Sequence, residues 1–477
     1  MERNRIRYHF LNTDAILSPI FIGVMVTIVF SVGIVTMLFP HRSMDIQSFN
    51  SLLLFLVWTL VVPYYFIYNF YNQPFDRYNN KLIFFGIINC LPYIILQYYL
   101  SYSLIPEIAP LSVGISDDRE YLRWSLFIEK VIDGELSWNN ADIDIDDRGF
   151  PTWIALLYHL FGHSDLAIKL FNALFVGLGG SMLARAVILI RGDENTAKLS
   201  GLLYCFMPTI AYLSGYMLKE TLMFFIIVGT IYGSVKLYHR ISISNFIMFS
   251  SFATLLFFLR TFLGVLVICL ALAYISSRSI KKIVMVIVIS LPIIIMSGSS
   301  MIFENKKISS GVEGLQGTGW FYKKNKSTGL LDSFGGVIGL VPFAPIMPAP
   351  SVLDLKSDVD KTNVAMMYRI HIDLVRMLLM FFFYLSIYYI YRNKQWSRYS
   401  LFILGAMGVV LVNAKVGVLT YYRYQSTSLM YFIPLMAYGI KHFTDDYRKN
   451  RIIFAIYVTL IILFVIFYNL FRLSLYK

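Results

Sequence analysis

The chain has 477 residues, of which 57% are hydrophobic and only 14% are charged. A soluble domain contains about 25% charged residues, so this composition excludes an ordinary water-facing surface. The net charge of +13 would suit nucleic-acid binding, but no nucleic-acid motif accompanies it. The apolar runs are roughly 20 residues long, which predicts an all-α polytopic membrane protein and not a β-barrel.

The apolar runs predict a membrane helix bundle of about 12–14 spans. In chain order we expect spans near 15–39, 51–72, 82–104, 166–190, 198–217, 221–238, 244–259, 261–277, 283–299, 370–391, 399–414, 426–440 and 452–471. The first run is too long for the apolar part of a signal peptide, so we expect no cleavable signal. Cys90, Cys205 and Cys269 lie far apart in apolar segments, which disfavours a disulfide framework or a zinc site.

Basic residues recur in every second connection between these spans, and the positive-inside rule assigns those connections to the cytoplasm. They include Arg3, Arg77, Lys81, Arg191, Lys198, Lys236, Arg240, Arg278, Lys281, Arg392, Lys394, Arg398, Lys441 and Arg448. Two long polar segments, 105–165 and 300–369, then fall on the extracytoplasmic side. The chain divides accordingly into 1–104, 105–165, 166–299, 300–369 and 370–477.

Each long segment contains a stretch too short or too irregular to span. Phe150–Phe161 is apolar but short, which predicts a helix in the membrane interface. The second segment is rich in lysine over 306–326 and contains four prolines over 335–350. A regular spanning helix would not accommodate four prolines, so we expect a re-entrant or interfacial element there.

The acidic patch at Asp117 and Asp118 is predicted to lie in a polar loop at the outer end of the third span. A carboxylate there can accept a proton from an incoming hydroxyl, or hold a divalent cation such as Mg²⁺ or Mn²⁺ beside a phosphate. Acidic residues in an external loop are also commonly just solvated. Charge alone leaves both interpretations open.

Three ionisable residues sit at the outer ends of predicted spans. Lys219 and Glu220 lie between two spans, where an ionisable pair is costly unless it is used or satisfied. A mutual ion pair would also explain them. Arg260 interrupts a long apolar run, and arginine suits bidentate contact with a phosphate.

Several short motifs occur in an order that resembles the GT-C glycosyltransferases, the multispan enzymes that use polyprenyl-phosphate-linked sugars. The resemblance covers roughly 117–238 and, more loosely, 420–440. In chain order the motifs are Asp117-Asp118-Arg119-Glu120-Tyr121, Gly149-Phe150-Pro151, Leu160-Phe161-Gly162-His163-Ser164, Lys169-Leu170-Phe171-Asn172, Pro208-Thr209-Ile210, Lys219-Glu220-Thr221-Leu222 and Arg423-Tyr424.

The resemblance implies roles for individual residues. Asp117 matches the family's catalytic carboxylate, which activates the acceptor hydroxyl, and Asp118 matches a second acidic position that supports it or binds a metal. Arg119 and Tyr121 belong to the same motif and are predicted to contact substrate. Lys219, Glu220, Arg260, Arg423 and Tyr424 are the predicted substrate-binding residues on the donor side. One departure is that three spans precede the acidic motif here, whereas in the family usually one does.

We therefore expect an integral membrane glycosyltransferase in a bacterial inner membrane, with its active site on the extracytoplasmic side. Its predicted partners are a polyprenyl-linked sugar donor, a glycan or lipid-glycan acceptor and membrane lipids, with no nucleic acid. Two alternatives stay open: a repeat-unit polymerase of the O-antigen or capsule type, and a flippase of lipid-linked sugars. A flippase would place ionisable residues in mid-span, along a path.

Overall fold

The computed structural model describes residues 58, 61–104, 117–137, 145–191, 193–276, 345–346, 363–416 and 425–474. Within these ranges the chain forms helices and turns and no strand, which confirms the all-α class. Internal contacts divide the chain into a larger unit, 66–344 with 395–434, and a smaller unit, 1–65 with 345–394 and 435–477. The predicted spans at 15–39 and 283–299 and nearly all of 300–369 lie outside the described residues.

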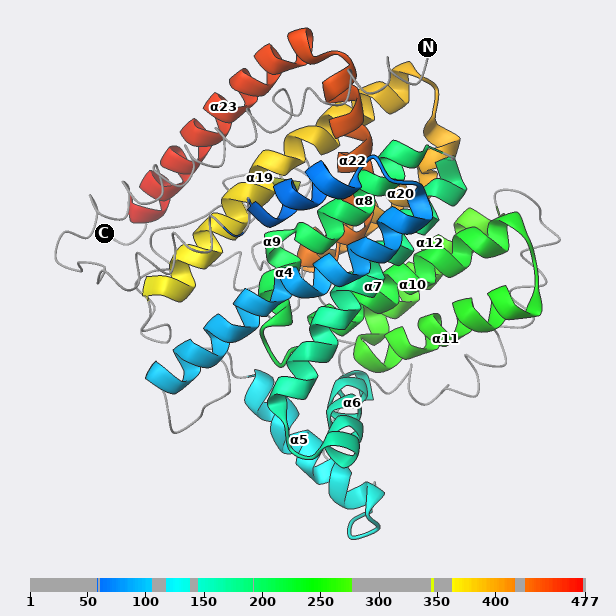
Figure 1. Cartoon of the computed structure of the whole chain (residues 1–477), viewed down its shortest axis with the longest axis vertical. Coiled ribbons are helices and arrows are strands. Elements are labelled where there is room, and N and C mark those ends of the chain that lie inside the picture. The colour runs from blue at the N-terminus through cyan, green and yellow to red at the C-terminus, as the bar shows by residue number, and fades with distance from the viewer. Residues whose placement is uncertain are drawn as a thin grey trace. The chain divides into compact units, whose positions relative to one another are not determined.

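The helices of each unit are labelled in Figure 1. Those of the larger unit are α4 (Phe75–Leu104), α5 (Asp117–Ile132), α6 (Ile145–Phe161), α7 (Asp165–Arg191), α8 (Glu194–Phe206), α9 (Pro208–Ser214), α10 (Glu220–His239), α11 (Ile243–Leu259), α12 (Thr261–Ser276) and α20 (Trp396–Val416). The smaller unit contains α19 (Asn363–Arg392), α23 (Tyr447–Ser474) and the part of α22 (Leu429–Asp445) that follows Pro434.

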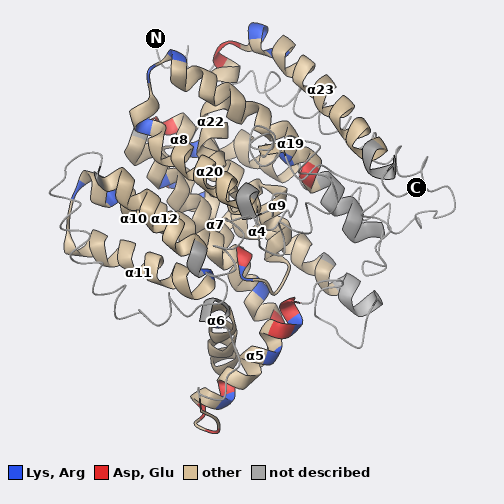
Figure 2. Ribbon diagram, turned by 180° about the vertical axis from the view of Figure 1, so that it is seen from behind, with Lys and Arg blue, Asp and Glu red and all other residues tan. Residues whose placement is uncertain are grey.

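Five described helices are long and apolar enough to cross a membrane, which agrees with the prediction of a membrane protein. They cover Asp165–Ile190, Glu220–His239, Ile372–Arg392, Trp396–Asn413 and Tyr447–Leu470. Ile243–Leu259 and Leu263–Ile275 are apolar but shorter. Each of these segments coincides with a predicted span. Figure 2 shows the helices as mostly uncharged, with Lys, Arg, Asp and Glu concentrated near helix ends.

The predicted single span at 198–217 is wrong, because the chain forms two helices there. Met207 is extended (φ −64°, ψ 118°) between α8 and α9. Pro208 follows it, and the proline ring disfavours helical geometry at the preceding residue. Residues 215–219 are again non-helical and fully buried before α10 begins at Glu220.

Small residues let α4, α7 and α8 approach closely at the centre of the larger unit. A Cβ on Gly86 of α4 would lie 2.9 Å from the Cα of Gly177 of α7, and a Cβ on Gly177 would collide with the carbonyl oxygen of Ile83. Gly201 of α8 approaches the backbone of Gly180 in the same way. Helices in apolar surroundings associate through such small-residue contacts, because lipid removes most of the hydrophobic driving force.

Polar contacts join the same three helices. Asn79 of α4 donates to Ser181 Oγ of α7 at 2.6 Å, and Asn89 donates to the carbonyl oxygen of Cys205 at 3.1 Å. The ammonium of Lys198 is buried, donates to the carbonyl oxygens of Tyr71 and Gln73 at 2.9 and 2.7 Å, and pairs with Glu194 at 2.7 Å. Lys198 therefore joins the start of α8 to the turn before α4.

Helices α10, α11 and α12 form the other side of the larger unit. Leu237, Phe249, Ala253, Ile268 and Ala271 form a buried apolar core among them. Helix α11 ends at Arg260, whose extended backbone (φ −166°, ψ 94°) separates it from α12. The two apolar segments that flank Arg260 are thus separate helices.

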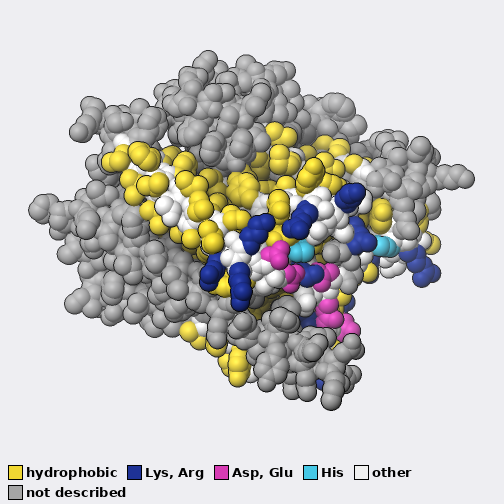
Figure 3. All heavy atoms as spheres, turned by 90° about the horizontal axis from the view of Figure 1, so that it is seen from above, with side chains coloured by type: hydrophobic (Ala, Val, Ile, Leu, Met, Phe, Trp, Pro, Cys, Tyr) yellow, Lys and Arg dark blue, Asp and Glu magenta, His cyan; other side chains and the backbone are white. Residues whose placement is uncertain are grey.

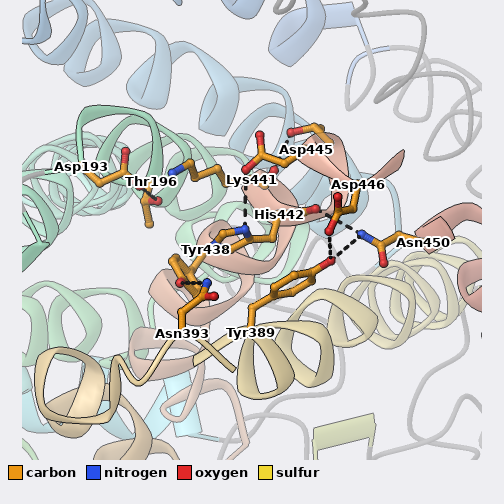
Figure 4. A network of polar contacts seen from close by, with 11 residues as sticks. Asp193, Thr196, Tyr389, Asn393, Tyr438, Lys441, His442, Asp445, Asp446 and Asn450 are labelled. Carbon is orange, nitrogen blue, oxygen red and sulfur yellow. Dashed lines mark hydrogen bonds and ion pairs between the residues drawn. The ribbon is translucent and has the colours of Figure 1, made fainter. Parts of the chain in front are cut away.

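A polar network joins the helices of the smaller unit (Figure 4). The hydroxyl of Tyr389 in α19 donates to Asp446 Oδ2 at 2.8 Å and accepts from Asn450 of α23 at 3.3 Å. Asn450 also donates to the carbonyl oxygen of His442 at 3.1 Å, and the His442 ring stacks on Tyr389 with centroids 4.5 Å apart.

Figure 3 shows Lys and Arg side chains gathered beside hydrophobic ones on one face of the protein.

We expect Gly177→Ala to lower the stability of the larger unit by about 1–3 kcal/mol, because the new methyl group would overlap the backbone of α4. Gly408→Ala is the control, since its Cβ would lie 3.6 Å or more from its neighbours, Leu266 and Leu270. Thermal unfolding in detergent measures both variants. Equal midpoints would contradict the close contact between α4 and α7.

We expect Tyr389→Phe to lower stability by about 1–2 kcal/mol, because Asp446 and Asn450 each lose a hydrogen-bond partner. Tyr391, two residues later, is 70% exposed, so Tyr391→Phe should leave the unfolding midpoint unchanged. A loss shared equally by both variants would point to a general effect of removing a hydroxyl and not to this network.

Candidate functional site

The acidic patch does not lie in a loop, contrary to the prediction, but forms the first turn of α5. Asp117, Asp118 and Glu120 occupy that turn, where the partial positive charge of a helix N-terminus stabilises carboxylates. Gly134 ends the helix with a positive φ of 78°, which glycine adopts without strain. The chain then returns as α6, so α5 and α6 form a helical hairpin (Figures 1 and 2).

Contacts along the whole hairpin hold α5 on α6. Ile128 and Ala155 form a buried apolar pair. The ring of Tyr121 lies edge-on to Phe150, with centroids 5.3 Å apart. His163, just beyond α6, pairs with Glu129 of α5 at 2.9 Å.

The predicted residues of the acidic patch differ sharply in burial. Asp118 is fully buried and Tyr121, one turn later, is 4% exposed, so both lie on the inner face of α5. Asp117 is half-buried and Arg119 is exposed. Of the two carboxylates, Asp118 is therefore the one enclosed by the protein.

Lys219 and Glu220 are also buried, and Lys219 approaches the inner face of α5. Lys219 is 4% exposed and Glu220 1% exposed. The ammonium of Lys219 lies 5.8 Å from the centre of the Tyr121 ring. Glu220 occupies the first turn of α10. The structure thus brings Lys219 to Tyr121, a residue about 100 positions earlier in the sequence.

Asn172 of α7 holds the non-helical segment that leads to Lys219. Its amide donates to the carbonyl oxygen of Tyr216 at 2.9 Å and reaches that of Ser214 at 3.5 Å. Buried carbonyl groups outside a helix need such donors. Asn172 itself is fully buried, and these contacts hold the backbone three to five residues before Lys219.

A second buried lysine, Lys169, lies one turn before Asn172 on α7. It is 2% exposed, and its ammonium lies 4.2 Å from the centre of the Tyr98 ring of α4. Burial disfavours its charged form, and the carboxylates of Asp165 and Asp118 oppose that effect electrostatically. Asp165 in turn accepts a hydrogen bond from the hydroxyl of Tyr158 in α6. Burial and this hydrogen bond raise the pKa of Tyr158 above its ordinary value.

We call Asp118, Lys169, Lys219 and Glu220 the buried charge cluster. It contains two cations and two anions, all at most 4% exposed. Buried charges are tolerated when opposite charges compensate them. Chemically, such a cluster offers a carboxylate that can take a proton and ammonium groups that can stabilise an anion.

Arg260 lies at the end of α11, which packs on α6. A Cβ on Gly149 of α6 would lie 2.6 Å from the carbonyl oxygen of Phe258, so the two backbones touch two residues before Arg260. Arg260 is half-buried at this junction, at the end of α11. Arg423 and Tyr424, the remaining predicted site residues, lie outside the described residues, as does the lysine-rich segment 306–326.

The predicted divalent cation stays a prediction. Within the described ranges no three His, Cys, Asp or Glu side chains gather as a metal site. His159 and His163 pair with different carboxylates, Asp133 just beyond α5 at 4.0 Å and Glu129 of α5 at 2.9 Å. A cation held by Asp118 or Glu220 would need substrate oxygens to complete its coordination.

Lys169, Asn172 and Tyr98 were not among the predicted site residues. The sequence contains one sign of them: Asp165, Lys169 and Asn172 follow at intervals of four and three, which places them on one face of α7. A lysine inside an otherwise apolar span also indicates a functional role by the same argument that singles out Arg260.

Comparisons with protein-family models, with curated proteins and with solved structures give no match. The resemblance to GT-C glycosyltransferases and the roles that it implies therefore stay predictions.

We expect Asn172→Leu to lower stability by about 1–3 kcal/mol, because it removes the donor to the buried carbonyl group of Tyr216. Asn245→Leu is the matched control. It removes a bond of the same length, 2.9 Å, to the carbonyl oxygen of Arg240, but in an exposed position where water can replace the donor. Thermal unfolding of the two variants should differ clearly, and a similar small effect for both would contradict a structural role for Asn172.

Proposed function

We propose that this chain is an integral membrane glycosyltransferase that moves a sugar or oligosaccharide from a polyprenyl-phosphate or pyrophosphate carrier to an acceptor hydroxyl. The observation that carries the proposal is the buried charge cluster at one end of an apolar helix bundle. A lipid-linked donor brings an anion to that position while its tail stays among apolar helices. Glycosyl transfer needs a proton acceptor near the incoming hydroxyl and cations near the leaving phosphate.

Within this proposal Asp118 is the base that accepts the proton of the acceptor hydroxyl. Its burial supports this assignment over Asp117, because a base in a water-poor site is not competing with bulk solvent. Lys219 stabilises the charge that develops on the leaving phosphate, and Arg260 at the end of α11 contributes a bidentate contact. A divalent cation, where bound, would neutralise phosphate charge.

The charges at the helix ends support an extracytoplasmic site. Arg77, Lys81, Lys236 and Arg240 lie at helix ends opposite to the one that holds the buried charge cluster. By the positive-inside rule those ends face the cytoplasm, and the cluster faces outward. This supports synthesis of an extracytoplasmic glycan in a bacterial inner membrane, with either a single acceptor or, as in a repeat-unit polymerase, a second lipid-linked glycan.

A flippase of lipid-linked sugars is the second candidate, and one observation favours it. Helical structure is interrupted between α8 and α9 and again over 215–219, and both interruptions are buried. Broken helices with buried ionisable residues also occur where transporters bind substrates. A flippase moves the intact donor across the bilayer and leaves the sugar–phosphate bond unbroken.

Replacing Asp118, the proposed base, tests the glycosyltransferase against the flippase. We expect Asp118→Asn to lower glycan transfer by roughly 10²–10⁴-fold, because the amide cannot accept the proton. The assay uses full-length protein in nanodiscs with polyprenyl-linked donors extracted from the source membrane. Asp117→Asn, the same change one residue earlier at a half-buried position, should keep most of the activity.

Both variants must first match the wild type in size-exclusion profile and unfolding midpoint. Loss of transfer in Asp117→Asn alone would return the base to Asp117. Full activity in both would remove the base from this patch. Transport of the donor across liposome membranes with no transfer by any protein would move the chain to the flippase class.

A further inference from the structure

The end of α19 and the start of α23 carry five cations that the proposed chemistry does not use. Arg392 and Lys394 lie at the end of α19 and just beyond it, and Arg448, Lys449 and Arg451 lie in the first turns of α23. All five are exposed. Figure 2 shows basic residues near the start of α23 and uncharged residues along the rest of its described length. We call these five residues the basic surface.

The two helix ends are held beside each other by the hydrogen bonds of Tyr389. Its hydroxyl donates to Asp446, just before α23, and accepts from Asn450 in the first turn of α23. Tyr389 lies one turn before Arg392, the last residue of α19, and Asn450 lies among the α23 cations. The cations of both helices therefore belong to one surface of the smaller unit.

The protein itself does not neutralise these cations. None of the five forms an ion pair with another described residue. The two carboxylates nearest to them in the sequence are Asp445, which pairs with His442 at 3.6 Å, and Asp446, which binds Tyr389. Five cations thus outnumber two carboxylates that have partners of their own, so the basic surface attracts anions from outside the chain.

An apolar face continues from the cations along α23. Arg448, Arg451, Ile452 and Ile456 lie at positions i, i+3, i+4 and i+8, which places them on one side of the helix. Ile452 is 60% exposed and Ile456 is 56% exposed. Only 17% of the apolar stretch of α23 is buried, against 44–72% in the other four candidate spans. This face of α23 is therefore left to contact lipid.

Tyrosines at the end of α19 mark the level of the lipid headgroups. Tyr388 is 47% exposed and Tyr391 is 70% exposed. Tyrosine is enriched at membrane–water interfaces, because its ring is apolar and its hydroxyl is polar. Both residues lie within about one turn of Arg392. The basic surface therefore lies at the depth where lipid phosphate groups are found.

We propose that the basic surface binds the phosphate groups of anionic phospholipids, whose acyl chains lie along Ile452 and Ile456. Charge complementarity selects an anionic headgroup, since a headgroup without net charge gains less from cations that no carboxylate neutralises. The positive-inside rule assigns the lipids to the cytoplasmic leaflet. This lipid site goes beyond the proposed function and does not depend on sugar transfer.

Lipid binding to the full-length protein in detergent tests the proposal. Native mass spectrometry measures the affinity for phosphatidylglycerol, the anionic probe, and for phosphatidylcholine with the same acyl chains. The wild type should bind phosphatidylglycerol more tightly. Arg448→Gln with Arg451→Gln should weaken that binding roughly 10–30-fold, because each basic residue near a headgroup contributes about a fivefold attraction. Binding of phosphatidylcholine should change little.

Arg77→Gln with Arg240→Gln is the matched control. It removes two exposed arginines from the same predicted side, but from two different helices of the larger unit, α4 and α10. It should leave the binding of phosphatidylglycerol nearly unchanged. Should the double variant of α23 fail to insert, Arg448→Gln and Arg451→Gln alone should each weaken binding about fivefold.

Three results would overturn the proposal. Equal losses in the two double variants would indicate a diffuse attraction to net charge. Equal binding of both lipids by the wild type would leave the cations with a role in topology alone. Displacement of phosphatidylglycerol by millimolar inorganic phosphate would assign the basic surface to a free anion. A wild type that transfers no sugar would end the proposed function and leave the lipid site untouched.

Discussion

A charge inside an apolar helix bundle persists only beside an opposite charge or a set of polar groups, and this constraint organises the larger unit. At one end of it Lys198 binds backbone carbonyl groups and Glu194, which joins α8 to the turn before α4. At the other end lie four more buried ionisable side chains, two cationic and two anionic: Lys169, Lys219, Asp118 and Glu220. Buried ionisable groups thus occur at both ends of the larger unit, and those at one end join α8 to the turn before α4.

Close packing of helix backbones underlies the part of the larger unit that contains the buried charge cluster. Glycines on α4, α7 and α8 remove the side chains that would keep these helices apart, and Asn79 and Asn89 add directional bonds between them. The helix interruption at Met207, before Pro208, and the non-helical segment 215–219 are both buried in the larger unit. Asn172 then binds carbonyl groups at the start of that segment.

The acidic motif is positioned by a different set of helix contacts. It is carried on α5, which packs on α6, and α6 touches α11 through the backbone contact of Gly149 with Phe258. Three separate segments therefore meet: the hairpin, the start of α7 and the start of α10.

The sequence by itself determined the helical class, the apolar helices and the residue types at their ends, because length, hydropathy and charge are local properties. It also marked Asp118, Tyr121, Lys219 and Glu220, although it placed the first two in a loop. Only the tertiary structure decided which of Asp117 and Asp118 is buried, and that Lys169 and Asn172 belong beside them. Those facts depend on helix rotation and on contacts between segments about 50 to 100 residues apart, which no local pattern encodes.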